Sequence, residues 1–206
     1  MKLYGFSQSR SFRALWALEE AGLDYEYIAI NFGSEDGPHG SRSPEYMAIN
    51  PQGKVPTLID GSLTLTESGA MLNHIARKAP EKKLIPLHDE EMLARYENFL
   101  FFVLSDLEQP LWTNGKHRFA LPEEQRVPQM LETATWEFAK AQRALHHQLE
   151  GRKFVVGDHF SAADILLAHT LNWADRFKFP VDKELLEYRD THFQRPAAQK
   201  TLTIVS

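Results

Sequence analysis

The period of the hydrophobic positions changes along the chain, and this change divides it into two parts. In residues 1–79, short apolar or alternating runs typical of strands follow stretches with the three-to-four-residue period of helices. From residue 89 onward the helical period persists. We therefore predict an N-terminal α/β domain over residues 1–79, a proline-containing charged linker over residues 80–88, and an all-α helical bundle over residues 89–206.

The first part predicts the element order β-α-β-α-β-β-α, which implies a mixed sheet covered by helices. The expected strands are residues 1–6, 23–32, 57–59 and 63–65, and the expected helices are residues 12–22, 43–50 and 67–79. Gly22 is a suitable C-terminal cap, and Ser43 followed by Pro44 is a typical helix start. Asp60-Gly61 predicts a two-residue hairpin turn between the last two strands.

The second part contains three long amphipathic patterns. One stripe of apolar residues runs from residue 89 to Leu107, and further helical patterns cover residues 128–151 and 160–177. Ser161 and Asp164 have the spacing of a capping box, and we interpret both as residues that serve folding.

Composition excludes several kinds of protein. The chain has 206 residues and a hydrophobic content of 43%, which is enough to bury a core. It has no cysteine, so disulfides, thiolate metal sites and cysteine nucleophiles are excluded. A net charge of −5 argues against nucleic acid, and no apolar stretch approaches the roughly 18 residues of a membrane-spanning helix. Because MKLYGFSQSR is also too short and too polar for a signal peptide, we expect a cytoplasmic protein. His146 and His147 are adjacent, so we expect solvated side chains and no metal site.

Three serines occupy alternate positions where the first strand gives way to the first helix. Ser7, Ser9 and Ser11 lie just before or at the predicted helix start, and one of them is enough to cap it. The others leave at least one hydroxyl for a ligand at the helix N-terminus, where free N–H groups and the helix dipole favour an anion.

Two further segments favour a bound peptide. A cis bond at Val55-Pro56 would turn the N–H and C=O of Val55 outward, although a proline before a strand is also a common edge residue. Such an exposed backbone pair can bind an extended peptide as an added strand. Glu67-Ser68 begins the next helix and offers groups for an amino-acid head, although capping alone also explains Ser68. Lys54 adds a cation for a terminal carboxylate, unless it is simply solvated.

Three segments of the chain resemble the signature regions of cytosolic glutathione transferases, in the same order and with similar gaps. These segments are MKLYGFSQSRSFRALWALEEAGLDYE, NPQGKVPTLIDGSLTLTESGAML and FVVGDHFSAADILLAHTLNWADRF. The resemblance implies a thioredoxin-like N-terminal domain, an all-helical C-terminal domain, a homodimer, and glutathione as co-substrate. The spacing of Ser9 and Arg13 is similar to that of the bacterial, serine-type (theta/phi-like) branch, in which a hydroxyl contacts the glutathione sulfur.

The resemblance also implies roles for single residues. Ser9 matches the residue that contacts sulfur, and Val55-Pro56 the pair that aligns the cysteinyl backbone. Glu67-Ser68 is similar to the pair that holds the γ-glutamyl group. Lys54, and less directly Arg42, match residues near the glycyl end.

We therefore expect a transferase that conjugates the glutathione thiolate to small hydrophobic electrophiles. The electrophile is expected between the two domains, beside aromatic residues that can equally belong to the core: Phe6, Phe101, Phe102 and Trp112. The alternatives are a glutathione-dependent peroxidase or disulfide reductase, and a non-catalytic binding or dimerisation module. The sequence leaves open whether Ser9, Ser11 or Ser7 contacts the sulfur.

Overall fold

The computed structural model describes residues 1–205 and contains two compact units. Unit 1 comprises Met1–Leu87 together with the chain from Phe193 onward, and unit 2 comprises His88–His192. The last helix, α9 (Pro196–Ile204), thus packs in unit 1, whereas the sequence pattern groups it with the helical domain. The physical reason lies in Arg195, whose guanidinium donates two hydrogen bonds, of 2.6 and 2.8 Å, to the carboxylate of Glu20.

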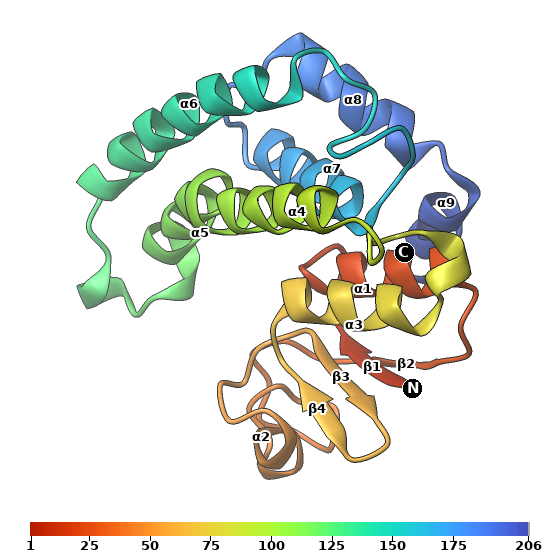
Figure 1. Cartoon of the computed structure of the whole chain (residues 1–206). Helices are drawn as coiled ribbons and strands as arrows, with labels where there is room; N and C mark the ends of the chain where they lie inside the picture. Colours follow the sequence, from red (N-terminus) through yellow and green to blue (C-terminus); the bar gives the residue numbers. More distant parts are fainter. Residues whose placement is uncertain (206) are drawn as a thin grey trace. The chain divides into compact units, whose positions relative to one another are not determined.

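A four-stranded mixed sheet with the order β2-β1-β3-β4 forms the centre of unit 1 (Figure 1). β1 (Lys2–Gly5) pairs in parallel with β2 (Glu26–Ala29) and antiparallel with β3 (Thr57–Asp60). β3 pairs antiparallel with β4 (Leu63–Leu65). The predicted mixed sheet and thioredoxin-like fold class are therefore confirmed, and the first two predicted strands, 1–6 and 23–32, are shorter than expected.

The hairpin turn lies one position later than predicted. Asp60 still pairs with Leu63, so the turn consists of the two residues between them, and Gly61 adopts a φ of 60°, which glycine tolerates without strain. Helix α3 holds the Asp60 side chain in place: His74 Nε2 lies 2.8 Å and Lys78 Nζ 2.5 Å from Asp60 Oδ2. These two contacts lower the pKa of Asp60, the lysine contributing most.

Helices pack on both sides of this sheet. They are α1 (Ser11–Ala21), α2 (Pro44–Ile49), α3 (Ser68–Lys78) and α9, with a short 3-10 helix, η1 (Pro80–Lys82). α1 and α3 pack together on one face of the sheet, and α2 lies on the other side (Figure 1). The predicted ends are confirmed: Gly22 caps α1 with a φ of 65°, and Ser43 Oγ accepts a hydrogen bond from the N–H of Tyr46 ahead of Pro44.

The core of unit 1 lies between the sheet and the helices α1 and α3. Its members are fully buried aliphatic side chains from four elements: Leu3, Leu15, Leu18, Leu58, Leu72 and Ile75. Burying such side chains stabilises a fold by about 1.5–3 kcal/mol each. The core therefore fixes α1 and α3 against the sheet, and with them the N-terminal ends of both helices.

Unit 2 is a helical bundle, as predicted. Its helices are α4 (Glu90–Phe102), α5 (Gln109–Gly115), α6 (Gln129–Leu149), α7 (Ala162–Arg176) and α8 (Lys183–Phe193), with a 3-10 turn, η4 (Glu123–Gln125). Two π-helical segments, η2 (Val103–Leu107) and η3 (Lys116–Ala120), follow α4 and α5. In each segment a backbone N–H donates to the carbonyl five residues earlier, which makes a wider turn than in an α-helix. In η2, for example, the N–H of Glu108 donates to the carbonyl of Val103. The apolar stripe does not reveal these wider turns.

The predicted capping box at the start of α7 is present. Asp164 Oδ2 accepts hydrogen bonds from the backbone N–H of Ser161 at 2.7 Å and from its hydroxyl at 2.8 Å. Its other oxygen accepts from the N–H of Val155 and from the Tyr188 hydroxyl. Burial, together with this carboxylate, raises the pKa of Tyr188. Asp164 therefore ties the chain before α7 to α8, as the folding role requires.

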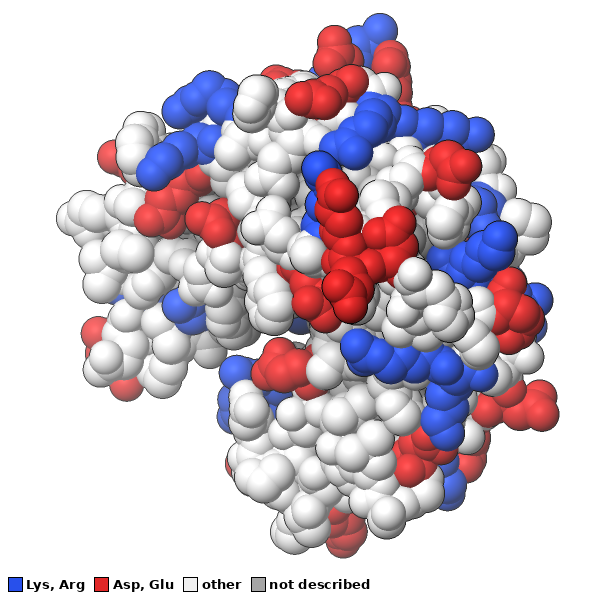
Figure 2. Space-filling view, viewed as in Figure 1, with Lys and Arg blue, Asp and Glu red and all other residues white. Residues whose placement is uncertain are grey.

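Charged side chains of both signs are mixed on the surface. On the face drawn in Figure 2, Lys and Arg side chains are interspersed with Asp and Glu. None of the helices within residues 1–205 has the length and apolar character that a membrane crossing requires.

Candidate functional site

The sheet topology brings three of the predicted site segments to one edge. β1 runs antiparallel to β3, and β3 to β4, so the end of β1, the start of β3 and the end of β4 are neighbours. The residues that follow β1, precede β3 and follow β4 therefore lie close together. They include Ser9, Val55 and Ser68. A hydrogen bond of 3.3 Å from Arg13 Nη1 to Ser68 Oγ joins the starts of α1 and α3 directly.

Ser9 lies at the N-terminal end of α1 and is half-buried. Its Oγ accepts a hydrogen bond from the N–H of Ser11 at 3.2 Å, and its carbonyl accepts one from the N–H of Phe12 at 3.0 Å. The N–H of Arg13 donates to the carbonyl of Arg10. The expected free N–H groups at this helix end are therefore occupied within the chain, because the serine turn caps them. The half-buried Ser9 and the exposed Ser7 are the serines of this turn that a ligand can reach.

The other two serines differ from Ser9 in exposure. Ser11 is completely buried, and its Oγ lies 2.9 Å from Ser9 Oγ and accepts from the N–H of Phe6 at 3.3 Å. Ser7 is exposed and adopts a φ of 42°, in the left-handed region. Ser11 cannot reach a bound molecule, and Ser9 is closer to the helix end than Ser7.

Buried polar side chains hold the segment Lys54-Val55-Pro56 in place by hydrogen bonds. The Tyr46 hydroxyl donates to the carbonyl of Lys54 at 2.6 Å, and Asn50 Nδ2 donates to the same oxygen at 2.8 Å. Both groups also contact the Thr57 hydroxyl. Burial raises the pKa of Tyr46 above its usual range, so this hydroxyl stays protonated as a donor.

The Val55-Pro56 peptide bond is cis, as the sequence suggests. Val55 is half-buried, and within the described residues its backbone N–H and C=O have no hydrogen-bond partner. Lys54 is exposed beside it. The segment therefore offers an available backbone pair next to a cation.

The start of α3 combines an exposed carboxylate with a buried hydroxyl. Glu67 is the exposed N-cap residue, and its carbonyl accepts from the N–H of Met71. Ser68 is buried and accepts from Arg13, whose guanidinium is completely buried. The first N–H groups of α3 and this cation make the local potential positive, which suits a carboxylate.

Arg42 and the aromatic candidates are exposed to different degrees. Arg42 is exposed in the loop before α2, held by a backbone hydrogen bond to the carbonyl of Ser34. Phe6 is 43% exposed and stacks on Phe32 in unit 1, and Phe101 is 69% exposed in unit 2. Exposure of this degree shows that these two rings do not belong to a core.

Sequence reasoning missed the buried polar residues that support the site. Tyr46 and Asn50 lie on or at the end of α2, and a helical pattern predicts their burial but not their partners. Arg13 is predicted as part of a motif, and its complete burial is unexpected for an arginine.

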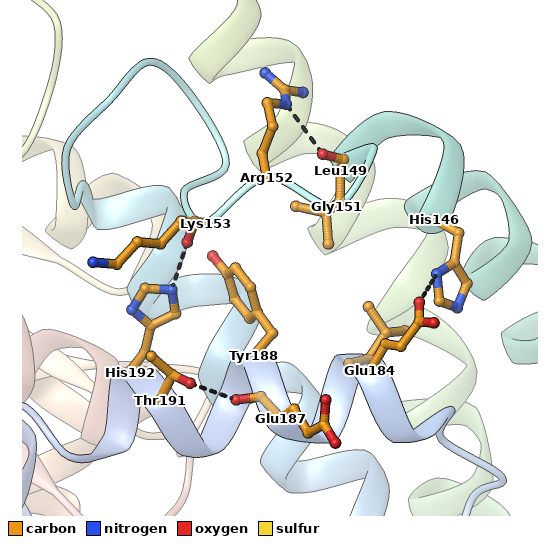
Figure 3. A pocket seen from close by; sticks show the side chains of 11 residues that line it. His146, Leu149, Gly151, Arg152, Lys153, Glu184, Glu187, Tyr188, Thr191 and His192 are labelled. Carbon is orange, nitrogen blue, oxygen red and sulfur yellow. Dashed lines mark hydrogen bonds and ion pairs between the residues drawn. The ribbon is translucent and has the colours of Figure 1, made fainter.

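Unit 2 contains a separate cavity of about 330 Å³ between the end of α6, the residues after it, and α8 (Figure 3). Its polar side chains already have partners: His192 Nε2 lies 3.0 Å from the carbonyl of Lys153, and the Thr191 hydroxyl donates to the carbonyl of Glu187. His146 Nε2 lies 2.8 Å from Asp182 Oδ2 in an exposed contact, because α6 ends beside the start of α8, and His147 is exposed. Within residues 1–205, no group of three or more metal-ligating side chains gathers at one place.

Comparison with known proteins assigns both halves of the chain. Residues 1–77 match the family model "Glutathione S-transferase, N-terminal domain", and residues 109–196 match "Glutathione S-transferase, C-terminal domain". Glutathione S-transferase GST-4.5 of Xanthomonas campestris pv. campestris is 32% identical over 201 residues, or 96% of this chain and 93% of the relative. Disulfide-bond oxidoreductase YfcG of Escherichia coli is 32% identical over 155 residues, or 72% and 68% of the two chains.

A solved structure resembles the whole chain. The glutathione S-transferase of a sphingomonad, complexed with glutathione, superposes with a TM-score of 0.85 at 28% identity. The match covers 100% of this chain and 98% of that protein.

Proposed function

Because this chain belongs to the glutathione S-transferase family, we propose that it binds glutathione at the sheet edge of unit 1 and conjugates it to small hydrophobic electrophiles. The observation that carries this proposal is the meeting, at one edge of the sheet, of the three segments predicted to bind the peptide, around Ser9, Val55 and Ser68. Two comparisons support it: the Xanthomonas relative is named a glutathione S-transferase, and the sphingomonad structure contains glutathione.

Each part of the tripeptide has a chemical counterpart in this arrangement. The backbone N–H and C=O of Val55, before the cis Pro56, pair with the cysteinyl residue as an added strand does. Glu67-Ser68 holds the γ-glutamyl end, the carboxylate facing its ammonium and the helix start facing its carboxylate. Lys54, with Arg42 from its loop, attracts the glycyl carboxylate.

Ser9 supplies the thiolate stabilisation of a serine-type enzyme. A free thiol has a pKa of about 8.5, and lowering it by two units requires about 2.7 kcal/mol. A hydroxyl that donates to a charged sulfur contributes about 1.5–3 kcal/mol, and the α1 dipole about 0.3–1 kcal/mol more. One serine at this helix end is therefore sufficient. The hydroxyl acts as a donor, not as a nucleophile.

The reaction needs no covalent group from the protein. The thiolate attacks an electrophilic carbon, a thioether bond forms, and the leaving group departs with its electron pair. We further propose that the active protein is a homodimer, which size-exclusion chromatography with light scattering tests directly.

Reduction of disulfides is the second candidate, favoured by the relative that is named a disulfide-bond oxidoreductase. The same thiolate would attack one sulfur of the substrate, displace the other as a thiolate, and leave a mixed disulfide that a second glutathione resolves. Because the chain has no cysteine, every sulfur atom that reacts in these two steps belongs to glutathione or to the substrate.

Titration with glutathione tests binding and the role of Ser9 together. We expect heat of binding by calorimetry, and thiolate absorbance from bound glutathione near neutral pH. Ser9→Ala should remove most of that absorbance while leaving the dissociation constant nearly unchanged, and Ser7→Ala serves as the matched control. Absence of binding heat would leave the fold as a non-catalytic module, and loss of absorbance in Ser7→Ala instead would reassign the sulfur contact.

Three substrates assayed side by side separate the two activities. A chloronitroaromatic reports conjugation, and a small organic disulfide and an organic hydroperoxide report reduction. We expect conjugation to be the fastest with the wild-type protein. Rapid turnover of the disulfide or the peroxide with no conjugation would contradict the transferase proposal.

A further inference from the structure

The turn between β1 and α1 contains two hydroxyl groups in direct contact, and the proposed function uses one of them. Ser9 Oγ and Ser11 Oγ lie 2.9 Å apart, so one donates its proton to the other. The direction of this hydrogen bond decides whether Ser9 presents a proton or a lone pair to a ligand. Only a presented proton stabilises a thiolate.

The surroundings of Ser11 fix that direction. Ser11 is 0% exposed, and its Oγ already accepts a hydrogen bond from the N–H of Phe6. Within the described residues, Ser9 Oγ is the acceptor available to the Ser11 proton. If Ser9 donated instead, the buried Ser11 hydroxyl proton would have no acceptor, and an unsatisfied buried donor destabilises the fold.

We infer that Ser11 is a positioning residue, which donates to Ser9 and thereby turns the Ser9 proton outward, toward the glutathione sulfur. This inference rests on the proposed function of Ser9. In this arrangement Ser9 Oγ accepts twice from residue 11, from its N–H at 3.2 Å and from its hydroxyl at 2.9 Å. Two accepted bonds fill both lone pairs of Ser9 and leave its proton for the ligand.

Accepting a hydrogen bond also makes a hydroxyl a stronger donor. Hydrogen bonds in a chain polarise and strengthen one another, by about 10–30% per bond. The motif thus contains a donor that contacts the ligand and a buried residue that polarises it. The close packing of this turn keeps the pair together: a Cβ atom at Gly5 would lie 2.8 Å from the Cβ of Ser11 and 2.7 Å from the ring of Tyr27.

The test is a double-mutant cycle read by the pKa of bound glutathione, measured from thiolate absorbance against pH. We expect Ser11→Ala to raise that pKa by roughly 0.2–0.6 units, less than Ser9→Ala does, with little change in the dissociation constant. In the Ser9→Ala background, Ser11→Ala should change nothing further, because Ser11 acts through Ser9. Ser11→Thr retains the hydroxyl and should restore the wild-type value.

A control separates positioning from general destabilisation. Ser161→Ala removes another buried serine hydroxyl, in the capping box of unit 2, and should lower Tm without moving the pKa of bound glutathione. An unchanged pKa in Ser11→Ala, or equal effects of that substitution with and without Ser9, would refute the role of Ser11 alone. An unchanged pKa in Ser9→Ala, or no binding of glutathione, would refute the proposed function of Ser9 and this inference with it.

Discussion

Removal of the Tyr46 hydroxyl is a sharp test of how the Lys54-Val55-Pro56 segment is held. Tyr46 donates to the carbonyl of Lys54 at 2.6 Å, so the contact between Tyr46 and Thr57 at 2.9 Å must be donated by Thr57. Tyr46→Phe therefore deletes one hydrogen bond to a carbonyl, worth about 0.5–1.5 kcal/mol. It also leaves the proton of the fully buried Thr57 without its acceptor, at about 1–3 kcal/mol.

These two effects together lower the free energy of unfolding by about 1.5–4.5 kcal/mol. For a chain of this length, Tm should fall by about 3–18 °C, measured by calorimetry. Tyr27→Phe is the matched control, because burial also raises the pKa of that tyrosine, but within the described residues its hydroxyl has no hydrogen-bond partner. Equal Tm changes in Tyr46→Phe and Tyr27→Phe would refute the reasoning.

Two further predictions concern carboxylates. Asp164→Ala leaves four donors around α7 without their acceptor, so urea denaturation should show a loss of more than about 3 kcal/mol, whereas Asp190→Ala, at the surface, should change little. Asp60 has a lowered pKa in the folded state, so its contacts stabilise the fold above the ordinary pKa of about 3.9 and lose effect as pH falls below it. The stability difference between wild type and Asp60→Asn should therefore shrink in acid, and a difference independent of pH would contradict this.

Local rules were sufficient where a feature depends on neighbouring residues in the chain. Gly22, Ser43 and the Ser161–Asp164 pair act within one helix turn, so their spacing alone predicts them. The order of strands and helices follows from periodicity for the same reason. The family resemblance then supplies the site residues, whose roles stay predictions until they are tested.

Features that depend on distant contacts were not predictable in this way. Glu20 and Arg195 are separated by 175 positions, so no local pattern indicates that the last helix returns to unit 1. The shifted hairpin has a similar cause, because His74 and Lys78 of α3 hold the side chain of Asp60. The π-helical turns leave the apolar stripe unchanged and therefore carry no periodic signal.

One arrangement recurs at all three segments of the candidate site. Each segment is hydrogen-bonded to a polar residue that is 0% exposed. Ser11 contacts Ser9, Tyr46 donates to the carbonyl of Lys54, and Arg13 donates to Ser68. A buried polar group destabilises the fold unless it is hydrogen-bonded, and in each case a partner is a site residue. The hydrogen bonds that keep these groups satisfied therefore also orient the site. Substitutions at the buried residues should consequently affect stability and glutathione binding or ionisation together, whereas substitutions at exposed Lys54 or Glu67 should affect binding alone.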